Sequence, residues 1–239
     1  MTTTSPLAPE TLNILRTVST ATLTTQLFKR GLRNVFIQGV SRLTHMEGNL
    51  VGPAFTVRNI PAREDLDQLS VFKDPDHPQR KSIEVIPKGH VMVIDCRRET
   101  RAASGGEILT TRLWKTGAAG LVSDGPIRDA GPISKLPFHV FCAGASAPTN
   151  LILHHAQDIN VPIGCGGVPV YPDDIIVGDQ DGVVVIPRHM ADDVARDAGE
   201  QELLETFILE RVRNGAKLPG TYPPNAETEA AYQTWKKAR

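Results

Sequence analysis

The sequence predicts an α/β fold in which a mixed sheet is flanked by helices at both ends of the chain. Three observations support this prediction. A β-loop-α-β unit spans residues 91–125, β-branched residues and turn dipeptides fill residues 161–187, and an apolar stripe runs along a helix at about residues 190–215. The first pattern is typical of a parallel crossover and the second of antiparallel hairpins. Because we find no internal repeat or low-complexity linker, we expect a single domain over residues 1–239.

The first part of the chain, about residues 1–32, predicts two short helices. Pro9 suits the first turn of one helix, and Ser19 or Thr20 is a suitable N-cap for the next, which Gly31 ends. These helices form the expected helical N-terminus.

A long strand is then predicted over residues 50–61, with Phe55 and Val57 on one face. The following segment, residues 62–90, is rich in charge and proline, so we expect a helix turn followed by an excursion loop rather than core.

Within the 91–125 unit the order is a buried strand, a loop over residues 96–106, a helix that ends at Gly117, and a second strand. Another strand is predicted over residues 139–144 before the hairpins. The C-terminal helix and arm take about residues 190–239, with a short helix expected in the tail.

Composition narrows the function classes. The net charge is −1, from 26 basic and 27 acidic residues, which argues against a nucleic-acid binder but leaves room for a local anion site. Cys96, Cys142 and Cys165 are widely spaced and odd in number, as expected of buried thiols in a reducing compartment. With no signal peptide and no apolar run of ~18 residues, we expect a cytoplasmic protein without a membrane segment.

Two polar segments follow adjacent predicted strands. The first is Ser104 to Ile108, where Gly105 and Gly106 lead directly into a helix at Glu107. Helix N-termini expose unpaired N–H groups that bind carboxylates or phosphates, although a Gly-Gly pair before a helix is also an ordinary turn. Neither G-x-G-x-x-G nor G-K-[ST] is present, so the segment is not a nucleotide loop of either kind.

The second segment is Ser123 to Gly131, which contains Arg128 and Asp129. Ligands of open α/β sheets bind at the carboxyl ends of strands. Arg supplies a planar fork of donors for an oxyanion, and Asp supplies a hard oxygen for Mg²⁺ or Mn²⁺. The alternative interpretation is a surface salt bridge or a turn cap.

Taken together, residues 105–129 resemble the family of 4-hydroxy-4-methyl-2-oxoglutarate / 4-carboxy-4-hydroxy-2-oxoadipate aldolases and the regulator of ribonuclease activity A. That family has a glycine loop before a helix and then a DGxxRD motif, here Asp124, Gly125, Arg128 and Asp129. The resemblance extends over most of the chain. It implies a swivelling α/β/β fold, assembled as trimers or hexamers with the active site between subunits.

The resemblance also implies residue roles. Backbone amides of Gly105, Gly106, Glu107 and Ile108 would hold the carboxylate of a 2-oxo acid. Arg128 would bind its C2 oxygen, and Asp129 would bind a divalent metal directly or through water. An acidic residue of a neighbouring chain's last helix, either Glu202 or Glu205, would reach the same site. The family's regulators lack the Asp of the Arg-Asp pair, so its presence here favours catalysis.

The chain departs from the family after the first long strand. Where the aldolases have a short turn, this sequence has Arg63, Glu64 and Asp65 followed by a charged insertion to about residue 82. The insertion is either a solvated loop or a substrate contact through Arg63.

The chemistry of the predicted site agrees with the resemblance. Cleavage of a C–C bond beside a 2-oxo acid leaves a pyruvate enolate, which a metal and an Arg would stabilise. We therefore expect a metal-dependent lyase that acts by retro-aldol cleavage or decarboxylation. The alternatives are a non-catalytic regulator or binding protein on the same fold, and a sugar-acid isomerase or dehydratase that uses a metal–enolate mechanism.

Overall fold

The structure, a computed structural model, describes residues 7–238 and has an α/β fold built on a curled mixed sheet. This confirms the predicted fold class, with helices at the N-terminus and a C-terminal helical arm. Within the described residues the strands are β1 (Phe36–Ile37), β2 (Ser41–Arg42), β3 (Leu50–Pro61), β4 (Val91–Asp95), β5 (Gly120–Ser123), β6 (His139–Cys142), β7 (His154–Ile159), β8 (Ile163–Cys165), β9 (Val168–Val170), β10 (Ile175–Gly178) and β11 (Val183–Ile186).

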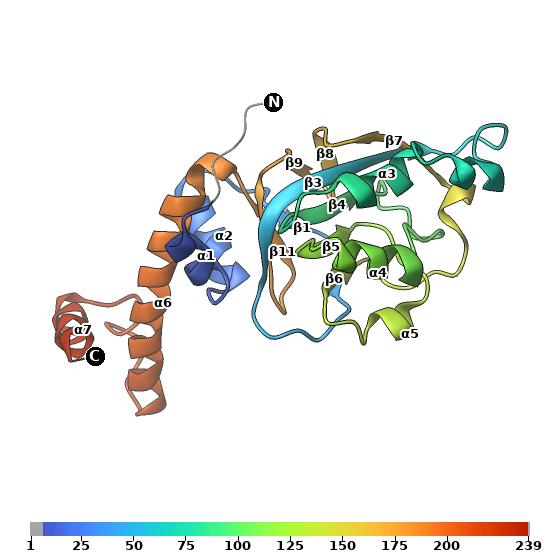
Figure 1. Cartoon of the computed structure of the whole chain (residues 1–239). Helices are drawn as coiled ribbons and strands as arrows, with labels where there is room; N and C mark the ends of the chain where they lie inside the picture. The colour runs from blue at the N-terminus through green and yellow to red at the C-terminus, as the bar shows by residue number, and fades with distance from the viewer. Residues whose placement is uncertain (1–6, 239) are drawn as a thin grey trace.

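The helices surround the sheet in two groups (Figure 1). The α-helices are α1 (Pro9–Leu15), α2 (Thr20–Lys29), α3 (Pro78–Val85), α4 (Glu107–Lys115), α5 (Ala130–Ile133), α6 (Ala191–Arg213) and α7 (Ala226–Lys237). Three short 3₁₀ turns complete the described elements: η1 (Leu69–Lys73), η2 (Asn150–Ile152) and η3 (Arg188–Met190). None of these helices has the length and apolar character that crossing a bilayer requires.

The long strand β3 joins an antiparallel half of the sheet to a parallel half. The strand order is β1-β11-β10-β3-β4-β5-β6-β2, with β7 also paired to β3. The first residues of β3, Leu50 to Pro53, pair antiparallel with β10, and Ala54 to Arg58 pair parallel with β4. Because β4, β5 and β6 are all parallel, their carboxyl ends lie at the same end of the sheet. The two polar segments singled out in the sequence follow the carboxyl ends of β4 and β5.

Three apolar cores hold the layers together. α1, α2 and α6 pack on the antiparallel half, where Leu23, Val184 and Val194 are fully buried. α3 and α4 cover the parallel half with Ile83 and Leu113. The third core lies inside the curled sheet and is closed by the β8–β9 hairpin. The helix α4, which carries the glycine loop at its N-terminus, is therefore fixed to the sheet by its own buried face.

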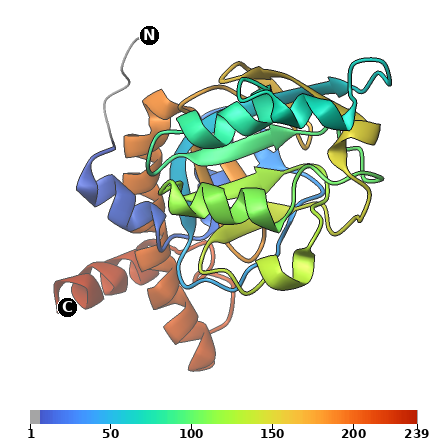
Figure 2. The same ribbon diagram turned by 45° about the vertical axis from the view of Figure 1, so that its right-hand side comes forward.

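The C-terminal arm extends beyond this body. Figures 1 and 2 show α6 lying along α1 and α2 and its second half projecting away from the sheet with α7. A small cluster of Phe207, Ile208 and Tyr232 joins α6 to α7.

Most predicted elements are confirmed with bounds within a few residues. Ser19 caps α2 by accepting a hydrogen bond from the Thr22 N–H. The 91–125 unit is a parallel crossover of β4, α4 and β5, and residues 161–187 form two antiparallel hairpins. That the whole chain is a single domain stays a prediction.

The prediction for residues 62–90 was wrong over α3, where we expected a loop. Pro78 occupies the first turn, where its missing N–H is not needed. Gln79, Ser82 and Ile83 then form a buried face at helical spacing. The high content of charge and proline, and the polar character of Gln79 and Ser82, concealed this buried face. The strands β1, β2 and β7 were also not predicted, because two have only two residues and β7 is polar.

His139 at the start of β6 makes stability depend on pH. Burial, and to a lesser extent the nearby charge of Arg42, lowers the pKa of His139 to about 4, against about 6.5 in an unfolded chain. The folded protein therefore prefers the neutral ring. Its contribution to stability is complete above pH ~6.5 and is lost as the pH falls toward 4. We expect the wild-type melting temperature to fall more steeply over this window than that of His139→Gln, measured by calorimetry at several pH values. Parallel curves would contradict the assignment.

Candidate active site

The first part of the candidate site is the glycine loop that precedes α4. Gly106 is the N-cap residue and has an extended backbone (φ −136°, ψ −171°). Because glycine has no side chain, it accepts no capping hydrogen bond from the first turn of α4. The first N–H groups of a helix lack intrahelical acceptors and lie at the positive end of its dipole. One of them, the Glu107 N–H, donates to Asp129 Oδ2 at 3.2 Å. The start of α4 therefore directs one donor, the Glu107 N–H, toward Asp129.

The second part is the Arg128–Asp129 pair that follows β5. Fully buried Ile127 anchors this turn, and the Arg128 N–H donates to the Gly105 carbonyl at 3.0 Å. Asp129 has left-handed backbone angles (φ 59°, ψ 36°), which Asp tolerates better than most residues. Asp129 Oδ2 lies 3.7 Å from Arg128 Nε, and the two side chains are 43% and 48% exposed. The fold thus brings the two predicted segments together.

Gly106 is required by the close approach of these two parts. A Cβ atom placed on it would lie 2.6 Å from Asp129 Oδ2 and 2.8 Å from Arg128 Cγ. Such distances are too short for non-bonded contact. Both side chains of the pair are therefore positioned directly against the Gly106 backbone.

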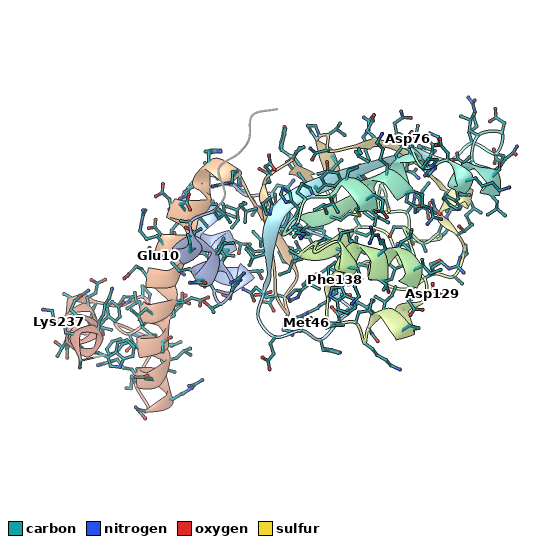
Figure 3. The ribbon with its side chains drawn as sticks, viewed as in Figure 1. Glu10, Met46, Asp76, Asp129, Phe138 and Lys237 are labelled. Carbon is teal, nitrogen blue, oxygen red and sulfur yellow. The ribbon has the colours of Figure 1, made fainter. Side chains whose placement is uncertain are left out.

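A cavity of about 460 Å³, here called the site cavity, opens beside the pair. It is lined by Leu69, Phe72, Gln79, Arg80, Ala103, Gly105, Gly106, Glu107, Ile108, Leu109, Arg128, Asp129, Thr149 and Asn150. Figure 3 labels Asp129 at the same end of the molecule as Asp76, which belongs to the inserted segment. The site cavity thus has one wall from the glycine loop and the Arg-Asp pair, and another from the insertion.

Asp124, the first residue of the DGxxRD motif, is a structural carboxylate. It is 2% exposed and accepts hydrogen bonds from the N–H groups of Cys96, Arg98 and Gly166. Arg97 and Arg98 both have left-handed φ angles, 59° and 56°. Asp124 therefore ties the turn after β4 to the β8–β9 hairpin rather than facing the site cavity.

We expect Asp124→Asn to destabilise the protein. Asn offers one oxygen where the carboxylate offers two, so at least one buried N–H loses its acceptor, at a cost of about 1–3 kcal/mol. This corresponds to a melting temperature lower by roughly 3–10 °C. Differential scanning calorimetry checks this, and an unchanged melting temperature would contradict the structural role.

Cysteine chemistry has no support beside the site. Burial raises the pKa of the Cys96 thiol to about 12. A neutral, enclosed thiol is neither a nucleophile nor a metal ligand at physiological pH.

Arg63 is not brought to the site cavity. Its guanidinium pairs with Asp65 at 2.7 Å, and both side chains are 66% exposed. The same segment instead contributes Arg80, a residue that no sequence motif had indicated. The one sequence feature that could have indicated it is Pro78, because proline is typical of the first turn of a helix. A helix from Pro78 would have placed residues 79–83 against the core.

Glu202 and Glu205 do not line the site cavity of their own chain. Both lie on α6, which Figure 1 places on the far side of the sheet from α4. Glu202 accepts a hydrogen bond from the Ser19 N–H, and Glu205 accepts one from the Gln201 side chain. A contribution from either residue to a neighbouring chain's site stays a prediction.

The residues present fit a divalent cation that keeps most of its water. Among residues 7–238 no group of three or more His, Cys, Asp or Glu side chains could hold a metal. Asp129 is a half-exposed carboxylate, and its Oδ1 makes no hydrogen bond to this described part of the chain. Mg²⁺ is commonly held by one or two carboxylates together with water and substrate oxygens. A closed structural zinc site needs four protein ligands and does not fit.

Comparison with known sequences places these features in a family. The family described as RraA-like, Aldolase/RraA, matches residues 20–185. A protein of Halalkalibacterium halodurans named "Putative 4-hydroxy-4-methyl-2-oxoglutarate aldolase" is 38% identical over 157 residues, which are 64% of this chain and 67% of that protein.

Two solved structures share the fold. An uncharacterized protein from Pseudomonas syringae pv. tomato matches with a TM-score of 0.77 at 24% identity, over 92% of this chain and 100% of that one. RraAS2 of Streptomyces coelicolor, described as an unusual member of the RNase ES inhibitor RraA protein family, matches with a TM-score of 0.75 at 28% identity. That match covers 85% of this chain and 98% of RraAS2.

Proposed function

The chain belongs to the Aldolase/RraA family, and from that premise we propose that it is a class II lyase that cleaves a C–C bond of a 2-oxo acid with a divalent metal. The observation that carries the proposal is the Arg128–Asp129 pair seated against the Gly106 backbone and the Glu107 N–H. The name of the Halalkalibacterium halodurans relative, a putative aldolase of a 2-oxo acid, supports the same reaction class.

In this proposal the glycine loop binds the carboxylate of the 2-oxo acid. The N–H groups at the start of α4 suit an anion because they have no acceptors within the helix and lie at the positive end of the helix dipole; one of them, the Glu107 N–H, already donates to a carboxylate, that of Asp129. Gly105 and Gly106 have no side chains, so a ligand can approach the backbone of this loop closely.

Arg128 binds the C2 oxygen, where negative charge develops as the C–C bond breaks. The backbone N–H of Arg128 donates to the Gly105 carbonyl, and this bond fixes the backbone of the turn. A pre-positioned guanidinium stabilises the enolate without reorganising during the reaction. In retro-aldol cleavage the bond between C3 and C4 breaks, and its electron pair forms the pyruvate enolate. The C4 hydroxyl loses its proton to solvent water as the new carbonyl forms, and the enolate takes up a proton from water at C3 to give pyruvate.

Asp129 is the residue that would hold the metal. A divalent cation there would supply Lewis-acid polarisation of the 2-oxo group. Mg²⁺ and Mn²⁺ are the cations proposed, because both prefer hard oxygen ligands.

A second candidate function is that of a non-catalytic binding protein. The similarity to RraAS2 favours it, since that protein is described within a family of RNase inhibitors. The two functions differ in their need for Asp129, because a carboxylate that binds a metal serves the lyase alone.

The test is release of pyruvate from 4-hydroxy-2-oxo acids and from oxaloacetate, followed with and without Mg²⁺ or Mn²⁺. The lyase requires metal-dependent pyruvate formation that a chelator abolishes. Absence of pyruvate from all of these substrates would favour the binding protein. Light scattering on the same preparation tests the proposed trimer or hexamer, which a mass of one 26.0 kDa chain would contradict.

A further inference from the structure

One wall of the site cavity comes from the segment between β3 and β4, where the sequence predicts an insertion. Leu69, Phe72 and Arg80 face the same space as Arg128 and Asp129. The cavity therefore has two guanidinium groups, one from the Arg-Asp pair and one from α3. Arg128 has a role in the proposed reaction, whereas Arg80 does not.

Arg80 is held in place by its neighbours. Its guanidinium carbon lies 4.2 Å from the centre of the Phe72 ring. Phe72 in turn packs edge-on against buried His77, with ring centres 5.5 Å apart. An Arg stacked on an aromatic face keeps its N–H edge free to bind a planar anion.

The helix that carries Arg80 is also tied to the glycine loop. The Gln79 side chain, 8% exposed, donates from Nε2 to the Ser104 carbonyl at 2.8 Å. Ser104 immediately precedes Gly105, so this bond sets the position of α3 relative to the proposed binding site of the 2-oxo acid.

Arg80 has no counter-ion in the part of the chain that the structure describes. Within residues 7–238 no carboxylate lies within 4.0 Å of its guanidinium, whereas Arg63, Arg101 and Arg112 all pair with acids at 2.6–2.7 Å. Partial burial lowers the pKa of Arg80 from its ordinary value. Arg side chains nevertheless stay charged at neutral pH. An unpaired, partly desolvated guanidinium beside a cavity is a strong site for a carboxylate.

We infer that Arg80 determines specificity by binding a second carboxylate, at the end of the substrate distant from the 2-oxo group. The inference rests on the proposed function, because the 2-oxo end is assigned to the glycine loop and Arg128. It assigns recognition of that second carboxylate to Arg80, on the cavity wall that Leu69, Phe72 and Arg80 form.

The test compares two ligands that lack the 4-hydroxyl and cannot undergo retro-aldol cleavage. 2-Oxoglutarate and 2-oxopentanoate have the same five-carbon chain, and only the first has a terminal carboxylate. Affinities for both are measured by titration calorimetry with saturating Mg²⁺ on the wild type, Arg80→Gln and Lys81→Gln. Lys81 is the matched control, because it is the next residue of α3, pairs with Asp76 at the surface, and does not line the cavity.

The wild type is expected to bind 2-oxoglutarate at least about 10-fold more tightly than 2-oxopentanoate. Arg80→Gln is expected to weaken 2-oxoglutarate about 10- to 100-fold, as for loss of a hydrogen bond between charged groups, and 2-oxopentanoate less than about threefold. Lys81→Gln leaves both affinities within about threefold. Equal wild-type affinities, no detectable binding of 2-oxoglutarate, or a preference that survives Arg80→Gln would overturn the inference.

Catalysis separates this inference from the proposed function. The matched substrates are 4-hydroxy-2-oxoglutarate and 4-hydroxy-2-oxopentanoate, which both release pyruvate. Arg80→Gln should raise KM for the first with little change in kcat, because it removes binding shared by ground and transition states. Pyruvate release with an unchanged preference would overturn the role of Arg80 alone. Arg80-dependent binding of 2-oxoglutarate without any pyruvate release would overturn the lyase and leave the ligand class standing.

Discussion

Asp129→Asn is expected to lower kcat for pyruvate release by about 1,000-fold or more and to remove its response to Mg²⁺ and Mn²⁺. The loss corresponds to about 4 kcal/mol, within the several kcal/mol that a metal ion supplies as a Lewis acid. Asn is the suitable replacement because it tolerates the left-handed backbone of this position. Its side-chain oxygen can still accept from the Glu107 N–H, so the α4 contact is kept. Steady-state kinetics over a range of metal concentrations measure the effect.

The control for this substitution is Asp193→Asn on α6. Asp193 is 63% exposed and pairs with Arg196 at the surface, where such pairs contribute about 0–1 kcal/mol. It should leave kcat and metal response within about twofold, and both variants should melt within a few degrees of the wild type. If Asp129→Asn kept wild-type turnover and metal response, Asp129 would be only a cap for α4 and the metal assignment would fail.

The parallel half of the fold could be predicted because its local signals agree with one another. Val91 to Ile94 are all apolar, and Gly117 ends the helix. The length of chain between the two strands is that of a parallel crossover. The edge strands could not be predicted in this way. β7 is polar, and it is a strand because the end of β3 offers it hydrogen-bonding partners that are remote in sequence.

The candidate site was predictable for a similar reason, and only in part. The glycine loop and the Arg-Asp pair are short segments at the ends of adjacent parallel strands, so their meeting follows from topology. Arg80 could not be found, because its proposed role depends on Phe72 beneath it, on the Gln79 bond to Ser104, and on the absence of a carboxylate within 4.0 Å among residues 7–238. Arg63 has the same charge in the same insertion but pairs with Asp65 two residues later. Three-dimensional contacts distinguish the two.

Gly106→Ala is expected to lower kcat/KM by at least about 100-fold, although the substitution adds one methyl group and removes no functional atom. The new Cβ would lie 2.6 Å from Asp129 Oδ2, so the carboxylate and the neighbouring Arg128 must move. A displacement of about 1 Å in an active site costs on the order of 100-fold. The backbone of Gly106 is extended and suits Ala, so strain in the glycine itself is not the cause. The matched control is Gly131→Ala, where a Cβ would meet nothing within 4 Å.

Metal binding shows whether the added methyl acts through Asp129. Gly106→Ala should weaken Mn²⁺ binding, measured by electron paramagnetic resonance, in the wild-type background. In the Asp129→Asn background it should change the residual binding by less than about threefold, because two substitutions that disable the same contact are not additive. Equal weakening in both backgrounds would mean that the methyl group disturbs a ligand other than Asp129. Full activity of Gly106→Ala would mean that the Arg-Asp pair does not need its observed position against the loop.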